Sequence, residues 1–399
     1  MKSRNSKPII IAGGGIGGLS TAMGLSQKGF HSVVLEKTSS FSEIGAGIQL
    51  GPNAFHAFDY LGVGDRAREM AVYIDSLRLM DAVSGQQIVR IALDGEFRER
   101  FNNPYAVVHR GDLHRVFLHA CESSELVELR ANTTVSGYKR ISDGVLVRLD
   151  DSSEAEGVAL IGADGLWSKV RSQLVGDGPP RVSGHTTYRS VIETSDMPQQ
   201  IRWNAATLWA GPKCHIVHYP LSDWNYFNLV VTYHNDAPKP VAGAPVTHDV
   251  VRKGFEHVNS VARQVIERGR NWKLWVLCDR DPISNWVDGP VTLLGDAAHP
   301  MLQYFAQGAC MAMEDAVCLT DEMERQDGDV ETAFANYRDR RYLRTAKIQL
   351  MSRLIGDHIY HCTDAHAQLR NSIMGEKSQS DWCDTLSWIY GSTGIEGAV

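Results

Sequence analysis

A glycine-rich segment near the start of the chain has the spacing of a dinucleotide-binding turn. Residues 13–18 read Gly-Gly-Gly-Ile-Gly-Gly and match the pattern G-x-G-x-x-G. Gly13 permits a sharp turn, Gly15 lets a pyrophosphate approach the backbone, and Gly18 lets the following helix pack closely. The free N–H groups and the dipole of that helix attract phosphates. The segment therefore predicts a dinucleotide site.

An acidic residue at a suitable distance extends this prediction. Glu36 follows the glycines by about 20 residues, where a carboxylate accepts hydrogen bonds from ribose hydroxyls. A 2′-phosphate would be repelled by this carboxylate, so Glu36 argues against NADP at this site. The motif alone does not separate FAD from NAD.

The elements around the glycines are typical of a nucleotide-binding fold. Residues 8–12 predict a short buried strand, residues 16–28 a helix, and residues 32–35 a second strand with Glu36 at its end. Together they form a βαβ unit.

The middle of the chain is richer in strand signals, and its end is helical. The alternating or β-branched stretches predict a mostly antiparallel sheet inserted between parts of the nucleotide-binding domain. The predicted strands of that sheet lie in residues 145–149, 186–219 and 224–233. Residues 291–294 predict one more buried strand, and the predicted helices lie over 307–325 and 337–355, with the chain helical beyond residue 330.

Composition limits the class of protein. The chain has 399 residues, of which 43% are hydrophobic and 22% charged, the balance of a soluble globular protein. Its length predicts roughly two to three domain-sized units. The net charge of −7 argues against nucleic acid or an anionic membrane as a main partner.

The cysteines indicate a reducing compartment. All 7 are scattered without a C-x-x-C pair, so they predict neither a disulfide framework nor a zinc site, and we expect no metal. The N-terminal stretch lacks the apolar core of a secretory signal, and no stretch approaches the ~18 apolar residues of a membrane span. We therefore expect a cytoplasmic protein.

Two further motifs give a specific resemblance. Gly295-Asp-Ala-Ala-His-Pro300 and Gly162-Ala-Asp-Gly-Leu-Trp-Ser-Lys-Val-Arg171 resemble the second and middle fingerprints of the flavoprotein aromatic hydroxylases, the p-hydroxybenzoate-hydroxylase-like FAD monooxygenases. The resemblance implies bound FAD, with Asp296 on its ribityl chain. Asp164 is expected to have the mainly structural role of capping a helix that starts near Leu166.

Other segments supply the remaining contacts that the resemblance implies. The segment 109–114 resembles a helix start whose arginine reaches FAD, and the segment 43–53 resembles the loop that passes the isoalloxazine ring. Backbone N–H groups near the start of the helix 307–325 face the flavin N1–O2 edge. The predicted FAD-binding residues are Gly13, Gly15, Ile16, Gly18, Glu36, Lys37, Ala46, Gly47, Arg110, Asp296, Gly308 and Ala309.

The resemblance covers about residues 8 to 320 and implies an α/β fold. We expect a Rossmann-like, glutathione-reductase-type FAD-binding domain, an inserted mostly antiparallel β-sheet substrate domain and C-terminal helices. The expected division is FAD-binding parts at 1–72, 100–180 and 285–330, substrate-domain parts at 73–99 and 181–284, and a C-terminal helical region at 331–399.

The family resemblance also implies a reaction. NADH reduces FAD, O2 then forms a C4a-hydroperoxide, and its distal oxygen attacks an electron-rich aromatic ring. Ring attack is favoured when a phenol is deprotonated, so the site needs an acid–base group and a dry pocket. The strand Gly211-Pro-Lys-Cys-His-Ile-Val-His-Tyr-Pro220, the helix start at 304–315 and Trp388-Ile-Tyr-Gly391 are similar to those of members that convert 3-hydroxybenzoate into gentisate.

Three residues are the predicted catalytic group. His215, Val217 and Tyr219 share one face of a strand. The hypothesis is that His215 accepts the phenol proton with help from Gln307, while Tyr219 orients the ring or the carboxylate. The neighbouring His218 lies on the opposite strand face. The alternatives are structural roles. His215 would form its hydrogen bonds within the sheet, and Gln307 would only cap a helix.

Several readings stay open. Salicylate 1-hydroxylation with release of catechol, another hydroxybenzoate hydroxylation and a non-hydroxylating FAD-fold protein are alternatives. An NAD-dependent dehydrogenase would leave the motifs at 162–171 and 295–300 without a role, and the W-x-W-x-I-P motif of flavin halogenases is missing. A small aromatic acid is the expected substrate, with NADH and O2 as co-substrates, and the family habit is a homodimer.

The remaining conspicuous residues are interpreted as structural. Met311 and Met313 are expected in the core. Three C-terminal histidines are expected to be solvated or at an interface, and three C-terminal aromatic residues to pack the end of the chain onto the body or a dimer contact. The histidines are His358, His361 and His366, and the aromatic residues are Trp382, Trp388 and Tyr390.

Overall fold

The computed structural model describes residues 7–42, 47–391 and 393–394. Its N-terminal part is the predicted βαβ unit: β1 (Ile9–Ala12), α1 (Ile16–Gln27) and β2 (Ser32–Leu35), with β1 and β2 paired in parallel. Both strands are fully buried and entirely apolar apart from Ser32, as strands covered on two faces are.

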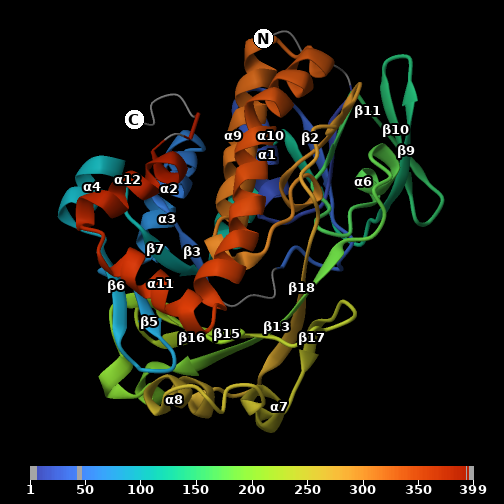
Figure 1. Ribbon diagram of the computed structural model, residues 1–399. Coiled ribbons are helices and arrows are strands. Elements are labelled where there is room, and N and C mark those ends of the chain that lie inside the picture. Colours follow the sequence, from blue (N-terminus) through green and yellow to red (C-terminus); the bar gives the residue numbers. More distant parts are fainter. Residues whose placement is uncertain (1–6, 43–46, 392, 395–399) are drawn as a thin grey trace.

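A six-stranded sheet continues this unit. Its order is β19-β20-β12-β1-β2-β8, parallel except for the edge strand β19. The helix α1 packs against α9 and α5 beside this sheet (Figure 1). The added elements are β8 (Val127–Arg130), β12 (Ala159–Gly162), β19 (Val287–Asp288), β20 (Val291–Leu293), α5 (Arg110–Glu122) and α9 (Gly308–Arg325).

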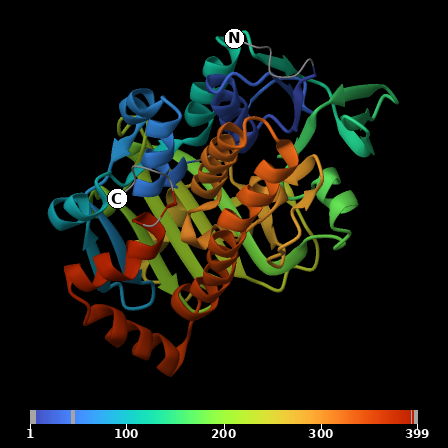
Figure 2. The ribbon, with the colours of Figure 1, turned by 90° about the horizontal axis from the view of Figure 1, so that it is seen from above.

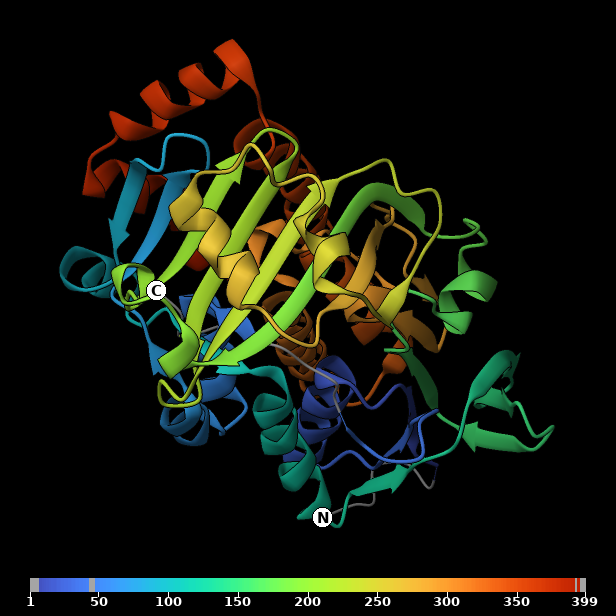
Figure 3. The same ribbon diagram turned by 90° about the horizontal axis from the view of Figure 1, so that it is seen from below.

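A second, eight-stranded sheet lies below the first and is antiparallel except where β14 meets β5, as the sequence predicted for the substrate domain. Figure 2 shows the long C-terminal helices crossing one face of it, and Figure 3 shows α7 (His248–Arg252) and α8 (Ser260–Arg268) on the other. In spatial order the strands are β17 (Ala242–Pro245), β18 (Lys273–Asp279), β13 (Arg181–Glu193), β16 (Tyr226–His234), β15 (Cys214–Leu221), β14 (Ala205–Gly211), β5 (Ser76–Asp81) and β6 (Gln87–Ala92).

One predicted strand belongs elsewhere. The alternating residues 145–149 fall in β10, which pairs only with β9 and β11 in a separate three-stranded sheet, so their assignment to the inserted sheet was wrong. An alternation of apolar and polar residues indicates that one face of a strand is buried, but it does not show to which sheet the strand belongs. The smaller elements are β9 (Val135–Ile141), β10 (Gly144–Leu149), β11 (Glu154–Gly157), β3 (Gly47–Leu50), β4 (Val72–Tyr73), β7 (Ala106–His109), α2 (Pro52–Tyr60), α3 (Gly64–Met70), α4 (Gly95–Phe101) and α6 (Lys169–Leu174).

As far as the structure describes it, the chain beyond residue 330 is mainly helical, as predicted. It forms α10 (Val330–Ile355), a π-helical turn at 356–360, α11 (Asp364–Gly375) and α12 (Gln379–Tyr390). Tyr390 makes edge-on ring contacts with Phe97 and Phe101 of α4, so the C-terminal aromatic residues do pack this segment onto the body. No helix within the described residues is long and apolar enough to cross a membrane.

The two methionines of α9 lie where they were expected. Met311 and Met313 are fully buried, one in the cluster of apolar residues under α12 and the other in the core beside the six-stranded sheet. The helix α9 thus lies in the middle of the molecule, with its N-terminal end directed between the two large sheets.

Candidate active site

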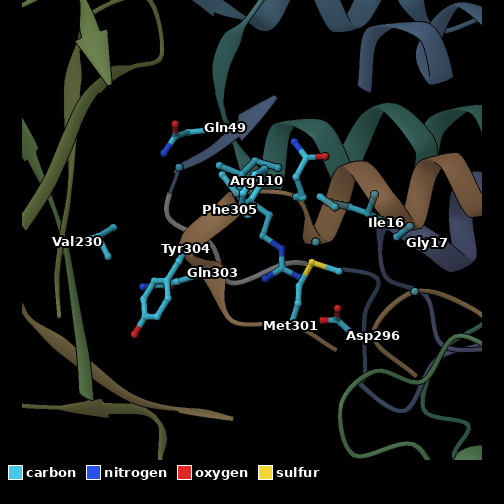
Figure 4. Close-up of a pocket in the computed structure, with 18 of the residues that line it drawn as sticks. Ile16, Gly17, Gln49, Arg110, Val230, Asp296, Met301, Gln303, Tyr304 and Phe305 are labelled. Carbon is cyan, nitrogen blue, oxygen red and sulfur yellow. The ribbon is translucent and has the colours of Figure 1, made fainter. Parts of the chain in front are cut away.

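One cavity of about 1180 Å³ runs between the two large sheets. Figure 4 shows Ile16, Asp296 and Met301 on one side of it and Val230 and Tyr304 on the other. Thirteen of the predicted site residues line this cavity: Gly13, Gly15, Ile16, Glu36, Lys37, Gly47, Arg110, His215, Tyr219, Asp296, Gln307, Gly308 and Ala309.

One described residue of the prediction, Gly18, is not in the lining. A Cβ at Gly18 would lie 1.9 Å from the carbonyl oxygen of Gly13, so Gly18 serves the close packing of helix on turn and not the ligand directly. Ala46 lies outside the described residues.

The glycine turn has the geometry that a pyrophosphate requires. Gly13 has φ of +109°, and a Cβ there would lie 2.3 Å from the carbonyl oxygen of Ala163, directly after the neighbouring parallel strand β12. The Gly14 N–H donates to Glu36 Oε2 at 2.8 Å, which fixes the acid at the end of β2 beside the cavity. No side chain caps α1 at Gly15, so the first N–H groups of this helix face the lining.

His114 is a supporting residue that the sequence did not single out. Its Nε2 lies 2.8 Å from the carbonyl oxygen of Gly14, and the ring is buried. It holds the turn from behind, from a helix one hundred residues further along the chain. Only the preceding arginine of the same segment, Arg110, had been given a role.

The second glycine–aspartate motif forms a turn directly opposite the start of α9. From a Cβ at Gly308 the nearest atom would be Asp296 Oδ1 at 4.0 Å, so the space between helix start and turn is open. Asp296 faces the cavity, where removal from bulk water raises the pKa of its carboxyl while His299 and Arg110 lower it. A helix N-terminus and a carboxylate across an open gap fit the pyrimidine edge and the ribityl hydroxyls of a flavin.

The middle motif supports that turn. Arg171 is fully buried and donates from Nη1 to the carbonyl oxygens of Ala297 and Ala298. Asp164 Oδ2 accepts the backbone N–H of Lys169 at 2.7 Å, so its predicted capping role is confirmed. The helix begins at Lys169, however, not near Leu166, because Ser168 occupies the capping position.

Buried charges brace the base of α9. Glu314 and Asp315 are fully buried, and Arg341 from α10 donates to both at 2.7 Å. Burial by itself raises the pKa of Asp315, but His299 and Arg341 lower it to about 2. Arg344 donates to both oxygens of Glu314 as well, at 2.7 and 2.9 Å. These carboxylates are therefore ionised and paired.

This network reaches the predicted catalytic glutamine through one asparagine. The amide of Asn53 donates to Glu314 Oε1 and to Gln307 Oε1, both at 2.8 Å. Gln307 stands at the N-terminal boundary of α9 but makes no side-chain cap there, so the capping alternative is not what the structure shows. Because Oε1 of Gln307 is held as an acceptor, its NH2 group is the donor left for a ligand.

His215 is buried at the other end of the cavity and lies on a common face with Tyr219. Its Nδ1 lies 2.8 Å from Nε2 of His361, and the two rings stack at 5.0 Å. Burial lowers the pKa of His215 to about 3, so the ring is neutral in the free protein. In the described residues its hydrogen bond goes to His361, and no direct contact with Gln307 is seen.

The expectation for the C-terminal histidines was wrong for one of them. His361 is 7% exposed and belongs to the wall around His215, because the π-helical turn after α10 brings it over the substrate sheet. His358 and His366 are exposed, as expected. Sequence spacing cannot reveal a contact between residues 146 positions apart.

Tyr219 connects the substrate sheet to the loop that was predicted to pass the flavin. A Cβ at Gly47 would lie 2.6 Å from Cε2 of Tyr219, so the glycine of the predicted flavin loop packs directly on this ring. The N–H of Gly47 donates to Asn228 Oδ1 at 3.0 Å, which ties the same loop to the neighbouring strand β16.

Arg189 is a candidate site residue that sequence reasoning missed. It lines the cavity on β13, donates from Nη2 to Gln303 Oε1 at 2.6 Å, and leaves a buried Nε without a partner. It forms no ion pair with any residue in the described ranges. Burial raises the pKa of Tyr219, and the charge of Arg189 partly offsets this rise. Its signal in the sequence was a cation inside the otherwise uncharged stretch 186–192 of a predicted strand.

Comparison with known proteins agrees with this site. The family model described as FAD binding domain matches residues 6–341. The chain is 52% identical over 97% of its length to 3-hydroxybenzoate 6-hydroxylase 1 of Aquipseudomonas alcaligenes, and 44% identical over 96% to 3-hydroxybenzoate 6-hydroxylase of Polaromonas naphthalenivorans. The matches cover 98% and 96% of those relatives.

A solved structure gives the same fold. Klebsiella pneumoniae HpxO, complexed with FAD and uric acid, superposes with a TM-score of 0.84 at 25% identity, covering 98% of each chain. Fold and site together define an FAD-dependent oxidoreductase with aromatic side chains in its cavity wall. The chain belongs to the flavoprotein aromatic hydroxylase family, and FAD is its cofactor.

Proposed function

We propose that this protein hydroxylates 3-hydroxybenzoate para to its hydroxyl group, giving gentisate, with NADH and O2 as co-substrates. Relatives at 52% and 44% identity over nearly the whole chain carry the name of this activity. The observation that carries the proposal is a neutral base, His215, and a fixed amide donor, Gln307, in the wall of one cavity that also holds an unpaired arginine.

FAD, when bound, supplies the activation of O2 and the transfer of one oxygen atom to the ring. The chain's own part is to bind, orient and deprotonate the substrate. The glycine turn, Glu36 and the two helix N-termini hold the dinucleotide, and Asp296 holds its ribityl chain.

His215 accepts the phenol proton at its second nitrogen, since Nδ1 is committed to His361. The low pKa of the free ring rises when an anionic phenolate lies beside it, because the imidazolium then has a partner. The NH2 group of Gln307 donates to the same phenolate oxygen and stabilises the charge that directs attack to the para carbon. Asn53 keeps that amide in the donating orientation.

Arg189 is the partner for the substrate carboxylate. A guanidinium with an unpaired buried Nε matches a carboxylate, and such charge-assisted hydrogen bonds are roughly twice as strong as neutral ones. Tyr219, on which this charge acts, orients the ring between the two ends. Anchoring the carboxylate away from His215 selects the 3-hydroxy isomer over the 2-hydroxy isomer, in which both groups are adjacent.

The test is NADH oxidation by the FAD-loaded protein with 3-hydroxybenzoate, salicylate and 4-hydroxybenzoate in parallel, with products identified by chromatography. Gentisate from 3-hydroxybenzoate is the expected result. Catechol from salicylate as the main product would replace the proposed substrate while keeping the family. NADH oxidation that yields only peroxide with all three acids would refute the substrate.

We also propose that the protein is a homodimer, following the family resemblance, and that its FAD-binding domain is assembled from residues 1–72, 100–180 and 285–330. Size-exclusion chromatography with light scattering tests the first point: a mass of twice the 44.2 kDa chain is expected, and a monomer would contradict it.

A further inference from the structure

Three histidines from distant segments meet behind the substrate pocket. His185 lies on β13, His234 ends β16, and His361 follows the π-helical turn after α10. One ring nitrogen of each lies within 4.8 Å of the corresponding atoms of the other two. His185 and His361 are 3% and 7% exposed, whereas His234 is half-buried and gives the cluster an opening to solvent.

The hydrogen bonds of this cluster leave one buried nitrogen without a partner. His185 uses Nδ1 for the hydroxyl of Tyr304, and His361 uses Nε2 for His215. Nδ1 of His361 is buried and has no hydrogen-bond partner among the described residues. Leaving a buried polar atom without a partner destabilises the fold, so its retention here needs a reason.

We propose that His185, His234 and His361 bind a divalent transition metal ion such as Zn²⁺, and that the ion controls His215. Three neutral imidazoles are a common ligand set for such ions. A tetrahedral zinc with bonds of about 2.0–2.1 Å needs nitrogens ~3.3 Å apart. The rings therefore have to move together by at most ~1.5 Å, which the half-buried His234 allows.

Asp236 adds to this arrangement. Its Oδ1 lies 3.2 Å from Nε2 of His234, and its side chain is 81% exposed. A carboxylate on the second nitrogen of a metal-binding histidine orients the ring and makes it a stronger ligand. Solvent fills the fourth position from the same open side.

The control of His215 follows from the positions of the protons and rests on the proposed function of that residue. In one arrangement His215 donates from Nδ1 to His361, and its Nε2 has a free lone pair that accepts the phenol proton. In the other, His361 donates from Nε2, and Nε2 of His215 carries a proton. Both arrangements contain the same number of protons, and exchange between them releases one from Nδ1 of His361 while another reaches Nε2 of His215, with water as the carrier.

A metal ion on Nδ1 of His361 selects the second arrangement. The metal occupies the only other nitrogen of that ring, so Nε2 must carry the proton and donate it to His215. Nε2 of His215 is then a donor and cannot deprotonate a phenol. The ion is therefore expected to inhibit hydroxylation without entering the substrate pocket.

The experiment is isothermal titration of ZnCl2 into the FAD-loaded protein after treatment with a chelator and its removal. Wild type is expected to bind one equivalent. His234→Gln is expected to bind it more than about tenfold more weakly, since a ligand is lost. His257→Gln is the matched control: this exposed histidine lies 3.6 Å from Cys214 Sγ, the sort of pair that collects zinc adventitiously, and its loss is expected to leave the titration unchanged.

Hydroxylation rates with and without Zn²⁺ complete the test. Inhibition in wild type and its relief in His234→Gln support control of His215. Equal zinc affinity of wild type and His234→Gln overturns the site, and equal inhibition of both proteins overturns the control. If 3-hydroxybenzoate is not the substrate, no gentisate forms in any sample, yet the titration still decides whether the metal site exists.

Discussion

The two ends of the cavity treat buried charge in opposite ways. Behind the flavin side, Glu314 and Asp315 are paired with arginines from α10. On the substrate side, Arg189 and His361 keep buried nitrogens without partners. Charged groups that are already paired are held in one geometry by their partners. Polar groups without partners are stabilised most by a ligand that forms hydrogen bonds with them. The comparison assigns rigidity to the first end and recognition to the second.

The strongest way to test the substrate end is to remove its base. His215→Ala is expected to lower the rate of ring hydroxylation about 100- to 10,000-fold, the usual contribution of general base catalysis. Flavin reduction by NADH without substrate should stay near the wild-type rate in stopped-flow measurements. An unchanged hydroxylation rate would remove His215 from the mechanism. His218→Ala, on the opposite strand face, is the control and should retain hydroxylation.

Breaking the paired end should cost stability and not specificity. Arg341→Ala leaves two buried carboxylates short of a partner and is expected to lower the free energy of unfolding by roughly 3–5 kcal/mol. Arg338→Ala, which removes an exposed pair with Asp339 on the same helix, should change it by less than ~1 kcal/mol. Urea unfolding of both variants gives the comparison, and equal losses would contradict it.

Removing the unpaired cation should affect substrate binding specifically. Arg189→Met is expected to raise KM for a hydroxybenzoate about 10- to 100-fold, since hydrogen bonds to a charged group contribute ~1.5–3 kcal/mol. KM for NADH is the internal control. The same variant should bind the free phenol, which has no carboxylate, as well as wild type does. A loss that is equal for phenol and acid would show that Arg189 only supports the sheet.

The smallest effect is a pH dependence of stability, which separates a buried histidine of the substrate sheet from the paired carboxylates behind the flavin side. Burial lowers the pKa of His218 to about 3, so between pH 6.5 and 3 the unfolded chain binds a proton that the folded chain does not. Stability should therefore fall on acidification, by ~1.4 kcal/mol per pH unit for this group. The carboxyl of Asp315, with a pKa of about 2, contributes stability that is lost only as the pH falls below 3.8.

Unfolding measured at pH 4.5, 5.5 and 6.5 tests that order. In His218→Gln, the free energy of unfolding should depend less steeply on pH, by the contribution of one titrating group. A slope equal to that of wild type would mean that His218 is protonated in the folded state.

Much of the fold and of the cofactor site follows from the sequence, because local geometry specifies it. Gly13 is needed where φ is positive, and Glu36 ends the adjacent strand within reach of the turn. The turn and Glu36 lie within about 25 residues of each other, and the motif around Asp296 repeats the same strand-to-turn pattern. Such spacing is visible without a structure.

The substrate end was determined only by the tertiary structure. Alternation along β15 put His215 and Tyr219 on one face, but nothing along the chain indicates that His361 stacks on His215 or that Arg189 lacks a partner. Those facts depend on how α10 crosses the sheet and on where its π-helical turn ends. Contacts between irregular segments that lie far apart along the chain produce no periodic pattern of residues. The sequence therefore determined which cofactor is bound, and tertiary packing decided which groups surround the substrate.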